Sequence, residues 1–276
     1  FTLALALATG AAAAQSTVWV SSEKDNALAV IDAATLAVQA PIATCKRPRH
    51  MQLMPGGKQL LVACAESNAA DLIDVATRKS IRRVPLGDDP EAFDLSPDGK
   101  TLYVSMEDEG ALGFVDIASG KMTQQVPVGK EPEGVKVSAD GKLVYVTSEV
   151  ANMVHAVDVA TAKVLHNVKV GKRPRRMSIT PDGAELWVTN ELDASVSIVS
   201  TKDHKVIHTI KFTLPGARAQ DITPVGIAMT KDGKRAFIGM GRANHVAFVD
   251  VAQRKVTQMV LAGKRVWNVA LDKAEA

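Results

Sequence analysis

Charged side chains recur at one spacing in this chain, and they are its first candidates for chemistry. Arg49, Glu91, Glu133 and Arg175 follow one another at intervals of 42 residues, while the sign of the charge varies. A ring of such groups can focus a small polar ligand or a partner's loop. The same groups can instead neutralise one another at a solvated rim, where an exposed ion pair contributes about 0–1 kcal/mol. Both interpretations stay open from the sequence, with catalysis as a third.

Other candidates for ligand or partner binding occupy neighbouring or equivalent positions of the same repeat. They are Arg47, His50, Glu149, Arg173, Lys264, Arg265 and Trp267. Glu149 shares its register with three further acids, each three residues beyond a valine: Glu23, Glu107 and Glu191. Trp267 has two interpretations, stacking on a ligand and packing within the protein.

Sequence motifs for catalysis are missing. The chain has no G-x-S-x-G nucleophile motif, no C-x-x-C-H haem motif and no EF-hand loop. A ring of carboxylates could hold a hard cation such as calcium, but the interspersed arginines oppose this. The sequence therefore assigns no catalytic residue and no metal ligand, and it favours a binding protein over an enzyme.

Glycines and short apolar runs define the repeat that positions these residues. Gly57, Gly99, Gly141 and Gly183 are spaced by 42 residues, and Gly233 follows after 50. Each repeat contains four short runs rich in β-branched residues and bounded by turn formers, which predicts four strands. This period with four strands is typical of a β-propeller blade. One eight-residue insertion within 212–223 explains the longer interval.

The repeat predicts an all-β, seven-bladed propeller with four-stranded blades. Five blades are complete, at about 49–85, 91–127, 133–169, 175–211 and 225–261, whereas the first lacks its inner strand. Residues 266–271 are predicted to be the inner strand of a further blade. Because a closed ring removes exposed sheet edges, we expect a C-terminal truncation of about one repeat, leaving 15–276 as one incomplete propeller domain.

The N-terminal segment and the charge indicate the compartment. Residues 1–14, FTLALALATGAAAA, have the apolar run and small-residue end of a signal peptide remnant. This run is shorter than the roughly 20 residues of a membrane span, so we expect an exported, monomeric chain without one. The formal net charge of +3 gives no indication of nucleic-acid binding. Cys45 and Cys64 could form a disulfide or remain two buried thiols.

Three motifs in the second predicted strand of a repeat indicate a family resemblance: LYVS at 102–105, VYVT at 144–147 and LWVTN at 186–190. With their preceding turns they resemble the YVTN family of β-propeller repeats. Blade-specific motifs then resemble one subgroup, the periplasmic propellers associated with pyrroloquinoline-quinone (PQQ)-dependent catabolism. These motifs include RPR at 47–49 and 173–175, EPEG at 131–134 and GKRVWNVAL at 263–271.

The resemblance implies a periplasmic binding or scaffold protein accessory to PQQ-dependent alcohol oxidation. Its expected partner is a quinoprotein dehydrogenase or the cytochrome of that enzyme. Two alternatives remain: a lactonase-like hydrolase with a metal at the funnel, and a PQQ carrier using Arg49, Arg175 and Arg265. The cofactor stays undecided between none, PQQ and a divalent cation.

Overall fold

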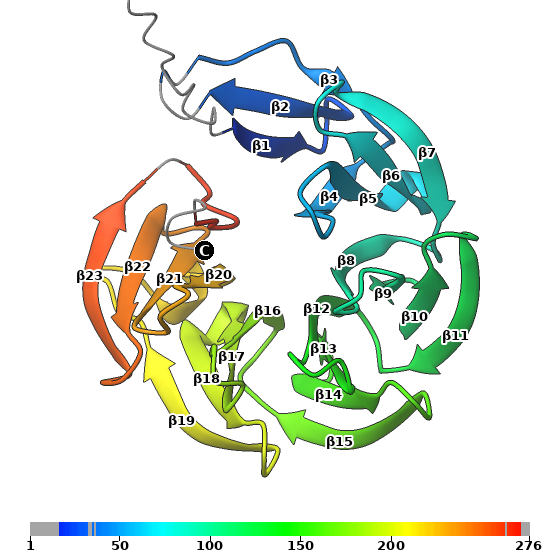
Figure 1. The fold of residues 1–276 in the computed structure, drawn as a ribbon. Coiled ribbons are helices and arrows are strands. Elements are labelled where there is room, and N and C mark those ends of the chain that lie inside the picture. Colours follow the sequence, from blue (N-terminus) through cyan, green and yellow to red (C-terminus); the bar gives the residue numbers. More distant parts are fainter. Residues whose placement is uncertain (1–16, 33–34, 36, 263, 272–276) are drawn as a thin grey trace, which may run out of the picture.

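The computed structural model describes residues 17–32, 35, 37–262 and 264–271 of this chain and shows an all-β propeller. Six antiparallel sheets, the blades, follow one another in chain order around a common axis (Figure 1). The signal peptide remnant predicted at residues 1–14 lies outside these ranges. Within the described residues, no helix has the length and apolarity needed to cross a membrane.

Blade 1 has three strands, and each of the other five blades has four. Blade 1 contains β1 (Thr17–Ser22), β2 (Ala27–Asp32) and β3 (Ile42–Ala43). Blades 2 and 3 contain β4 (Pro48–Leu53), β5 (Gln59–Cys64), β6 (Ala69–Asp74), β7 (Lys79–Pro85), β8 (Pro90–Leu95), β9 (Thr101–Met106), β10 (Ala111–Asp116) and β11 (Lys121–Pro127). Blades 4 and 5 contain β12 (Pro132–Val137), β13 (Leu143–Ser148), β14 (Met153–Asp158), β15 (Lys163–Lys169), β16 (Pro174–Ile179), β17 (Glu185–Asn190), β18 (Ser195–Ser200) and β19 (Lys205–Lys211). Blade 6 contains β20 (Pro224–Met229), β21 (Arg235–Met240), β22 (His245–Asp250) and β23 (Lys255–Leu261).

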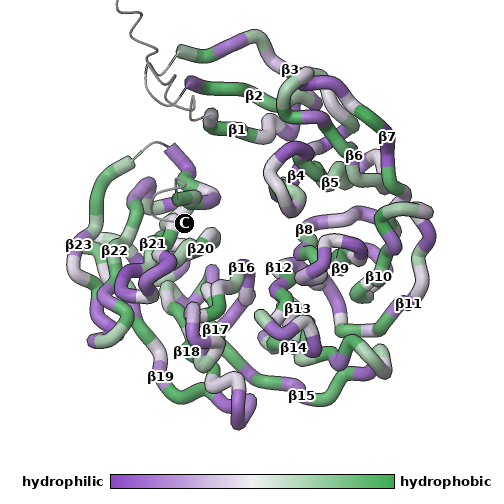
Figure 2. The backbone as a smooth tube through the Cα atoms, viewed as in Figure 1, coloured by the Kyte–Doolittle hydropathy of each residue, from purple (hydrophilic) through white to green (hydrophobic). Residues whose placement is uncertain are grey.

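The hydrophobic core lies between the blades. Five clusters of buried side chains each combine residues of two consecutive sheets. The two middle strands of a blade are buried on both faces, as in β9, whereas most of the outer strand β11 is exposed. Apolar stretches follow the strands and hydrophilic stretches follow the turns in Figure 2. This arrangement explains why β-branched runs without strict alternation form the central strands.

The turns after the inner strands set the register of each blade. Their glycines, including Gly99 and Gly141, have φ between 67° and 73°, a conformation that other residues rarely adopt. A Cβ at Gly99 would lie 2.8 Å from Cγ of Pro55 in the preceding blade's turn. These glycines therefore allow the turn, and Gly99, like Gly141, also allows the close approach of the neighbouring turn.

Short irregular segments connect strands within blades and between them. The described residues contain three short 3₁₀ helices. Two lie within a blade, η1 (Ala65–Ser67) in blade 2 and η2 (Glu191–Asp193) in blade 5, whereas η3 (Ala219–Asp221) lies in the predicted insertion between β19 and β20. Cys45 and Cys64 form a disulfide with a Cα–Cα distance of 5.7 Å, which joins the segment after β3 to the end of β5. The structure thus selects the disulfide over two free thiols.

The prediction of seven blades is wrong, because the structure is a six-bladed propeller. The five complete blades and the missing inner strand of blade 1 are confirmed. Residues 266–271, on which a further blade was predicted, form no strand in the structure. Strand pairing requires a ladder of bonds, whereas among the described residues this segment makes a single backbone bond, from Gly226 N to Trp267 O at 2.9 Å.

Candidate functional site

Loops at one end of the axis bring the predicted charged residues together, and we call this region the mouth. It consists of the segments that enter β4, β8, β12 and β16, the first residues of these strands, and the loops between the second and third strands of blades 2 to 5. The equivalent loop of blade 1, between β1 and β2, also belongs to it. Before each of these four inner strands, the residue at the turn has φ between 47° and 55°, as in Arg47 and Arg173. The carbonyl of the same residue accepts a bond from the neighbouring loop, for example Glu107 N to Asp89 O at 3.1 Å. The repeated geometry places the acids of one loop beside the charges of the other.

The first ion-pair cluster joins blades 1, 2 and 3. Arg49 pairs with the fully buried Glu91 and, at 3.1 Å, with Glu23. Arg47 contacts Asp89 at 3.1 Å and Glu91 at 3.6 Å. The predicted equivalence of Arg49 and Glu91 therefore becomes a direct contact between adjacent blades.

The second cluster joins blades 4 and 5. Arg175 is buried and pairs with Glu149, with Glu133 at 3.1 Å and with Glu191 at 3.7 Å. The more exposed Arg173 also contacts Glu149 and Glu191. The two clusters lie close enough for the carboxyl groups of Glu91 and Glu133 to affect each other's pKa.

Burial and neighbouring charges separate the proton affinities of these two acids. Burial and the Glu133 carboxylate raise the pKa of Glu91 to about 8, against the effect of Arg49. Burial also opposes ionisation of Glu133, but Arg176 and Arg175 overcome it and lower the pKa of Glu133 to about 2. The surroundings therefore favour the protonated form of Glu91 more than that of Glu133.

The mouth has more acids than guanidinium groups. Its acids are Glu23, Asp89, Glu91, Glu107, Glu133, Glu149 and Glu191. Its arginines are Arg47, Arg49, Arg173, Arg175 and Arg176. Each of these arginines contacts an acid of the mouth, and the seven acids outnumber the five arginines, so this set of side chains favours a positively charged partner.

Trp267 lies beside the second cluster and stacks on arginines of its own chain. The guanidinium carbons of Arg175 and Arg265 each lie 5.2 Å from the centre of its ring. Such cation–π contacts contribute about 0.5–2 kcal/mol. Lys264, Arg265 and Trp267 were predicted together as binding residues. Lys264 and Arg265 are exposed, whereas Trp267 is partly buried and contacts Arg175 of the second cluster.

Asp89, Glu91 and Glu107 form an acidic trio whose carboxylate oxygens lie within 4.8 Å of one another. Carboxylates suit calcium, which takes six to eight oxygen ligands. The trio supplies three, and Arg47 and Arg49 already bind two of its members. The carboxylate oxygens are of the kind that calcium binds, but the arginines paired with them oppose binding of a metal ion.

A cavity of about 210 Å³ lies on the axis among the inner strands. His50 lines it and packs edge-on against Phe93, with ring centres 4.8 Å apart. Burial and the charge of Arg176 lower the pKa of His50 to about 3, so the imidazole is neutral. His50, predicted at the mouth, thus belongs to the axial cavity.

The remaining polar lining of this cavity was missed as a site by the sequence analysis. It comprises Gln52, Asp94, Lys136, Arg176 and Asn268. Gln52, Asp94 and Lys136 share the 42-residue period, and that signal could have identified them. Asp94 bonds Gln52 at 3.2 Å and Lys136 at 2.9 Å, so consecutive blades are linked here as well.

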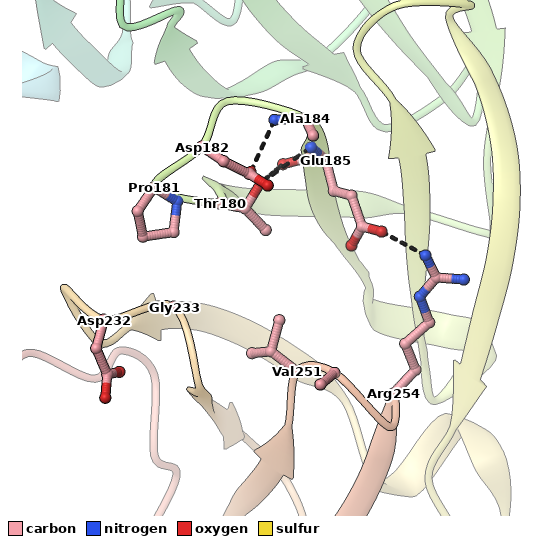
Figure 3. A pocket seen from close by; sticks show the side chains of 10 residues that line it. Thr180, Pro181, Asp182, Ala184, Glu185, Asp232, Gly233, Val251 and Arg254 are labelled. Atoms are coloured by element: carbon pink, nitrogen blue, oxygen red, sulfur yellow. Dashed lines mark hydrogen bonds and ion pairs between the residues drawn. The ribbon is translucent and has the colours of Figure 1, made fainter.

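A second cavity, of about 350 Å³, lies between blades 5 and 6 at their turns (Figure 3). Arg254 of blade 6 reaches across to Glu185 of blade 5. Asp182 accepts bonds within its own turn, from Thr180 at 2.6 Å and Ala184 at 3.0 Å. These contacts hold two blades and a turn in place, and they account for the polar groups of this groove.

Comparisons with known proteins give partial matches. A family model described as a YNCE-like β-propeller matches residues 2–85, and a model described as arylesterase matches residues 103–203. Each model covers less than half of the chain, and the first agrees with the propeller fold of the structure. No curated protein matches the sequence significantly.

Solved structures confirm the fold. A chain of Kuenenia stuttgartiensis hydrazine synthase superposes with a TM-score of 0.82 at 22% identity, covering 92% of this chain and 85% of that chain. A functionally unknown protein from Desulfotomaculum acetoxidans gives a TM-score of 0.78 at 16% identity, with coverages of 93% and 85%. At these identities the likeness concerns the fold alone.

Proposed function

We propose that this propeller is a non-catalytic recognition module that binds a basic segment of a partner protein at the mouth. The observation that carries the proposal is the excess of acids over arginines, held on a rigid frame of buried ion pairs. A frame whose charges are already positioned loses little conformational entropy when a partner binds. Exposed acids such as Glu23, with 46% of its side chain accessible, supply the attraction.

The narrower proposal is that the partner belongs to PQQ-dependent alcohol oxidation in the periplasm. It is supported by the blade-specific motifs at 47–49 and 173–175. The Cys45–Cys64 disulfide supports export, because such bonds persist in oxidising compartments. The pairing of Arg49 and Arg175 with acids gives no support to a PQQ carrier.

Capture from periplasmic extract tests this proposal. Tagged protein is compared with the triple variant Glu23→Gln, Asp89→Asn, Glu107→Gln, which removes mouth acids but keeps the buried arginine pairs of blades 4 and 5. We expect the wild type to capture a quinoprotein dehydrogenase or its cytochrome. The amount of partner captured by the variant should be at least tenfold lower. Capture should weaken as salt is added, because exposed charges are screened.

The matched control carries the same change of charge on the opposite face: Asp98→Asn, Asp140→Asn, Asp203→Asn. These acids lie in exposed turns, and their removal should leave capture unchanged. Equal losses in both triple variants, or no captured partner, would contradict recognition through the mouth.

A calcium-assisted hydrolase is the second candidate, favoured by the arylesterase match and the acidic trio. Elemental analysis and hydrolysis of phenyl acetate test it. Stoichiometric calcium together with hydrolysis, both lost in Glu107→Gln, would replace the binding proposal. Neither is expected, because Arg47 and Arg49 occupy oxygens that a metal would need.

A further inference from the structure

The axial cavity has a lining unlike that of the mouth. Its walls are apolar on several sides, with Met51, Phe93, Val135, Met177 and Ile227. Its volume of about 210 Å³ equals roughly seven water molecules at about 30 Å³ each. A small organic molecule with an apolar body fits such walls better than a hydrated ion.

The carboxylate in the lining is already satisfied. Asp94 accepts bonds from the backbone N–H of Leu95 at 2.9 Å and of Val137 at 3.0 Å. Its charge is balanced by Lys136, whose ammonium nitrogen lies 2.9 Å away. Asp94 therefore needs no cation from outside, and the Asp94–Lys136 pair is neutral as a unit.

Arg176 is the remaining charge of the lining, and it has donors to spare. Within the described residues, its guanidinium donates to Glu133 O at 3.3 Å and lies 3.5 Å from a carboxylate oxygen of Glu133. Glu133 is shared with Arg175, which lies 3.1 Å away, so Arg176 has part of one carboxylate as its counter-charge. Since a guanidinium has five N–H donors, most of those of Arg176 are not used in these contacts.

Two neutral groups add donors beside it. Asn268 uses its carbonyl oxygen to accept from Val269 N at 2.9 Å, which leaves its amide N–H₂ without an acceptor among the described contacts. The neutral His50 offers one donor and one acceptor. The free hydrogen-bonding capacity of the cavity is therefore mostly that of donors around one positive charge.

We propose that the axial cavity binds a small monocarboxylic acid, with its carboxylate on Arg176 and Asn268 and its apolar body against Phe93, Met177 and Ile227. A guanidinium and a carboxylate match in geometry and form strong charge-assisted bonds. A dianion such as phosphate would bring a second charge without a partner and no apolar body, which is unfavourable beside apolar walls. This inference goes beyond partner binding at the mouth and does not depend on it.

Calorimetric titration of the full chain with benzoate and butyrate tests the proposal. Benzamide, which has the shape of benzoate without its charge, and inorganic phosphate serve as comparison ligands. We expect saturable binding of at least one of the two acids, with benzamide and phosphate at least tenfold weaker. The proposal would be overturned if neither acid bound at about 10 mM, a concentration that reveals weak ligands. Equal binding of benzamide, or tighter binding of phosphate, would also overturn it.

Variants locate the binding. Arg176→Gln should weaken acid binding at least tenfold, and Asn268→Ala, in an exposed segment outside the strands, about threefold. Arg254→Gln makes the same change of charge in the groove between blades 5 and 6 and should leave the affinity unchanged. If Arg176→Gln fails to fold, Asn268→Ala decides the matter, and unaltered affinity in that variant overturns the assignment.

Discussion

Arg175 is the side chain on which the second ion-pair cluster depends. It is buried and contacts three carboxylates, whereas its neighbour Arg173 has 43% of its side chain exposed and contacts two. The equal charge and unequal burial of these two arginines make them a matched pair for testing the cost of leaving buried acids unpaired.

Arg175→Met should therefore destabilise the fold by about 3–5 kcal/mol, the cost of breaking a buried ion pair by removing one partner. Arg173→Gln should cost about 0–1 kcal/mol, as for an exposed pair. Urea unfolding followed by circular dichroism measures both. Similar losses in the two variants would contradict the view that burial decides the strength of this cluster.

His50 makes the stability of the fold depend on pH below the ordinary pKa of histidine, 6.5. The unfolded chain takes up a proton on His50 below its ordinary pKa of 6.5, but the folded chain resists until about pH 3. Protonation between these values therefore favours unfolding, so stability falls as the pH decreases from 6.5 towards 3.

His50→Gln should remove this part of the pH dependence. Between pH 7 and pH 5 the wild type should lose about 1–2 kcal/mol more unfolding free energy than the variant, at about 1.4 kcal/mol per pH unit. Urea unfolding at the two pH values provides the measurement. Parallel losses in both proteins would show that His50 is protonated in the folded state.

At the scale of elements, the sequence left undecided whether Cys45 and Cys64 form a disulfide, and the structure shows that they do. Cys45 and Cys64 are separated by 19 residues, and the bond ties the entry of blade 2 to its second strand β5. Blade 1 has only the two-residue strand β3 on its outside, so this covalent link secures the segment that follows it.

Replacing both cysteines by alanine should lower the unfolding free energy by about 3 kcal/mol, from the added freedom of a loop of this length in the unfolded chain. Thermal unfolding of the double variant, beside wild type with and without reductant, tests this. The reduced wild type should behave like the variant, and an unchanged melting temperature in both would contradict a stabilising bond.

Strand prediction succeeded where the sequence supplied all partners of a strand. Each run such as β9 or β13 has neighbours from its own repeat within about ten residues, so local pattern and pairing agree. Residues 266–271 carry the same pattern as an inner strand, but their described backbone bond is the single contact with Gly226. A pattern fixes which face of a strand can be buried, whereas pairing requires a second strand in place.

At the scale of the whole molecule, the core consists of layers between successive blades. Each layer is shared by two sheets, so each blade is stabilised mainly by its contacts with the two adjacent blades, as in other repeat proteins. Trp187 is fully buried in the layer between blades 5 and 6.

Trp187→Ala should therefore destabilise blades 5 and 6 more than the distant blades. Loss of a buried tryptophan costs about 3–5 kcal/mol, and we expect faster amide hydrogen exchange in β16–β23 with smaller changes in β8–β11. Mass spectrometry of deuterium uptake measures this. Ile207→Ala, at a side chain 46% exposed in β19, is the control and should change little. Uniform acceleration in every blade would contradict local coupling.

The sequence by itself determined the repeat, the five complete blades and the residues at the mouth, because turn glycines, β-branched runs and the 42-residue period act locally. It also placed Arg49 beside Glu91 and Glu133 beside Arg175, since equivalent positions of adjacent blades must be neighbours. Tertiary structure decided the number of blades, the disulfide and the axial cavity. These depend on how sheets converge on the axis and on which groups burial deprives of water, as with His50 and Arg176. The 42-residue period places equivalent residues around the axis, but it does not give the distances between them, because these arise from side chains of several blades meeting in one space.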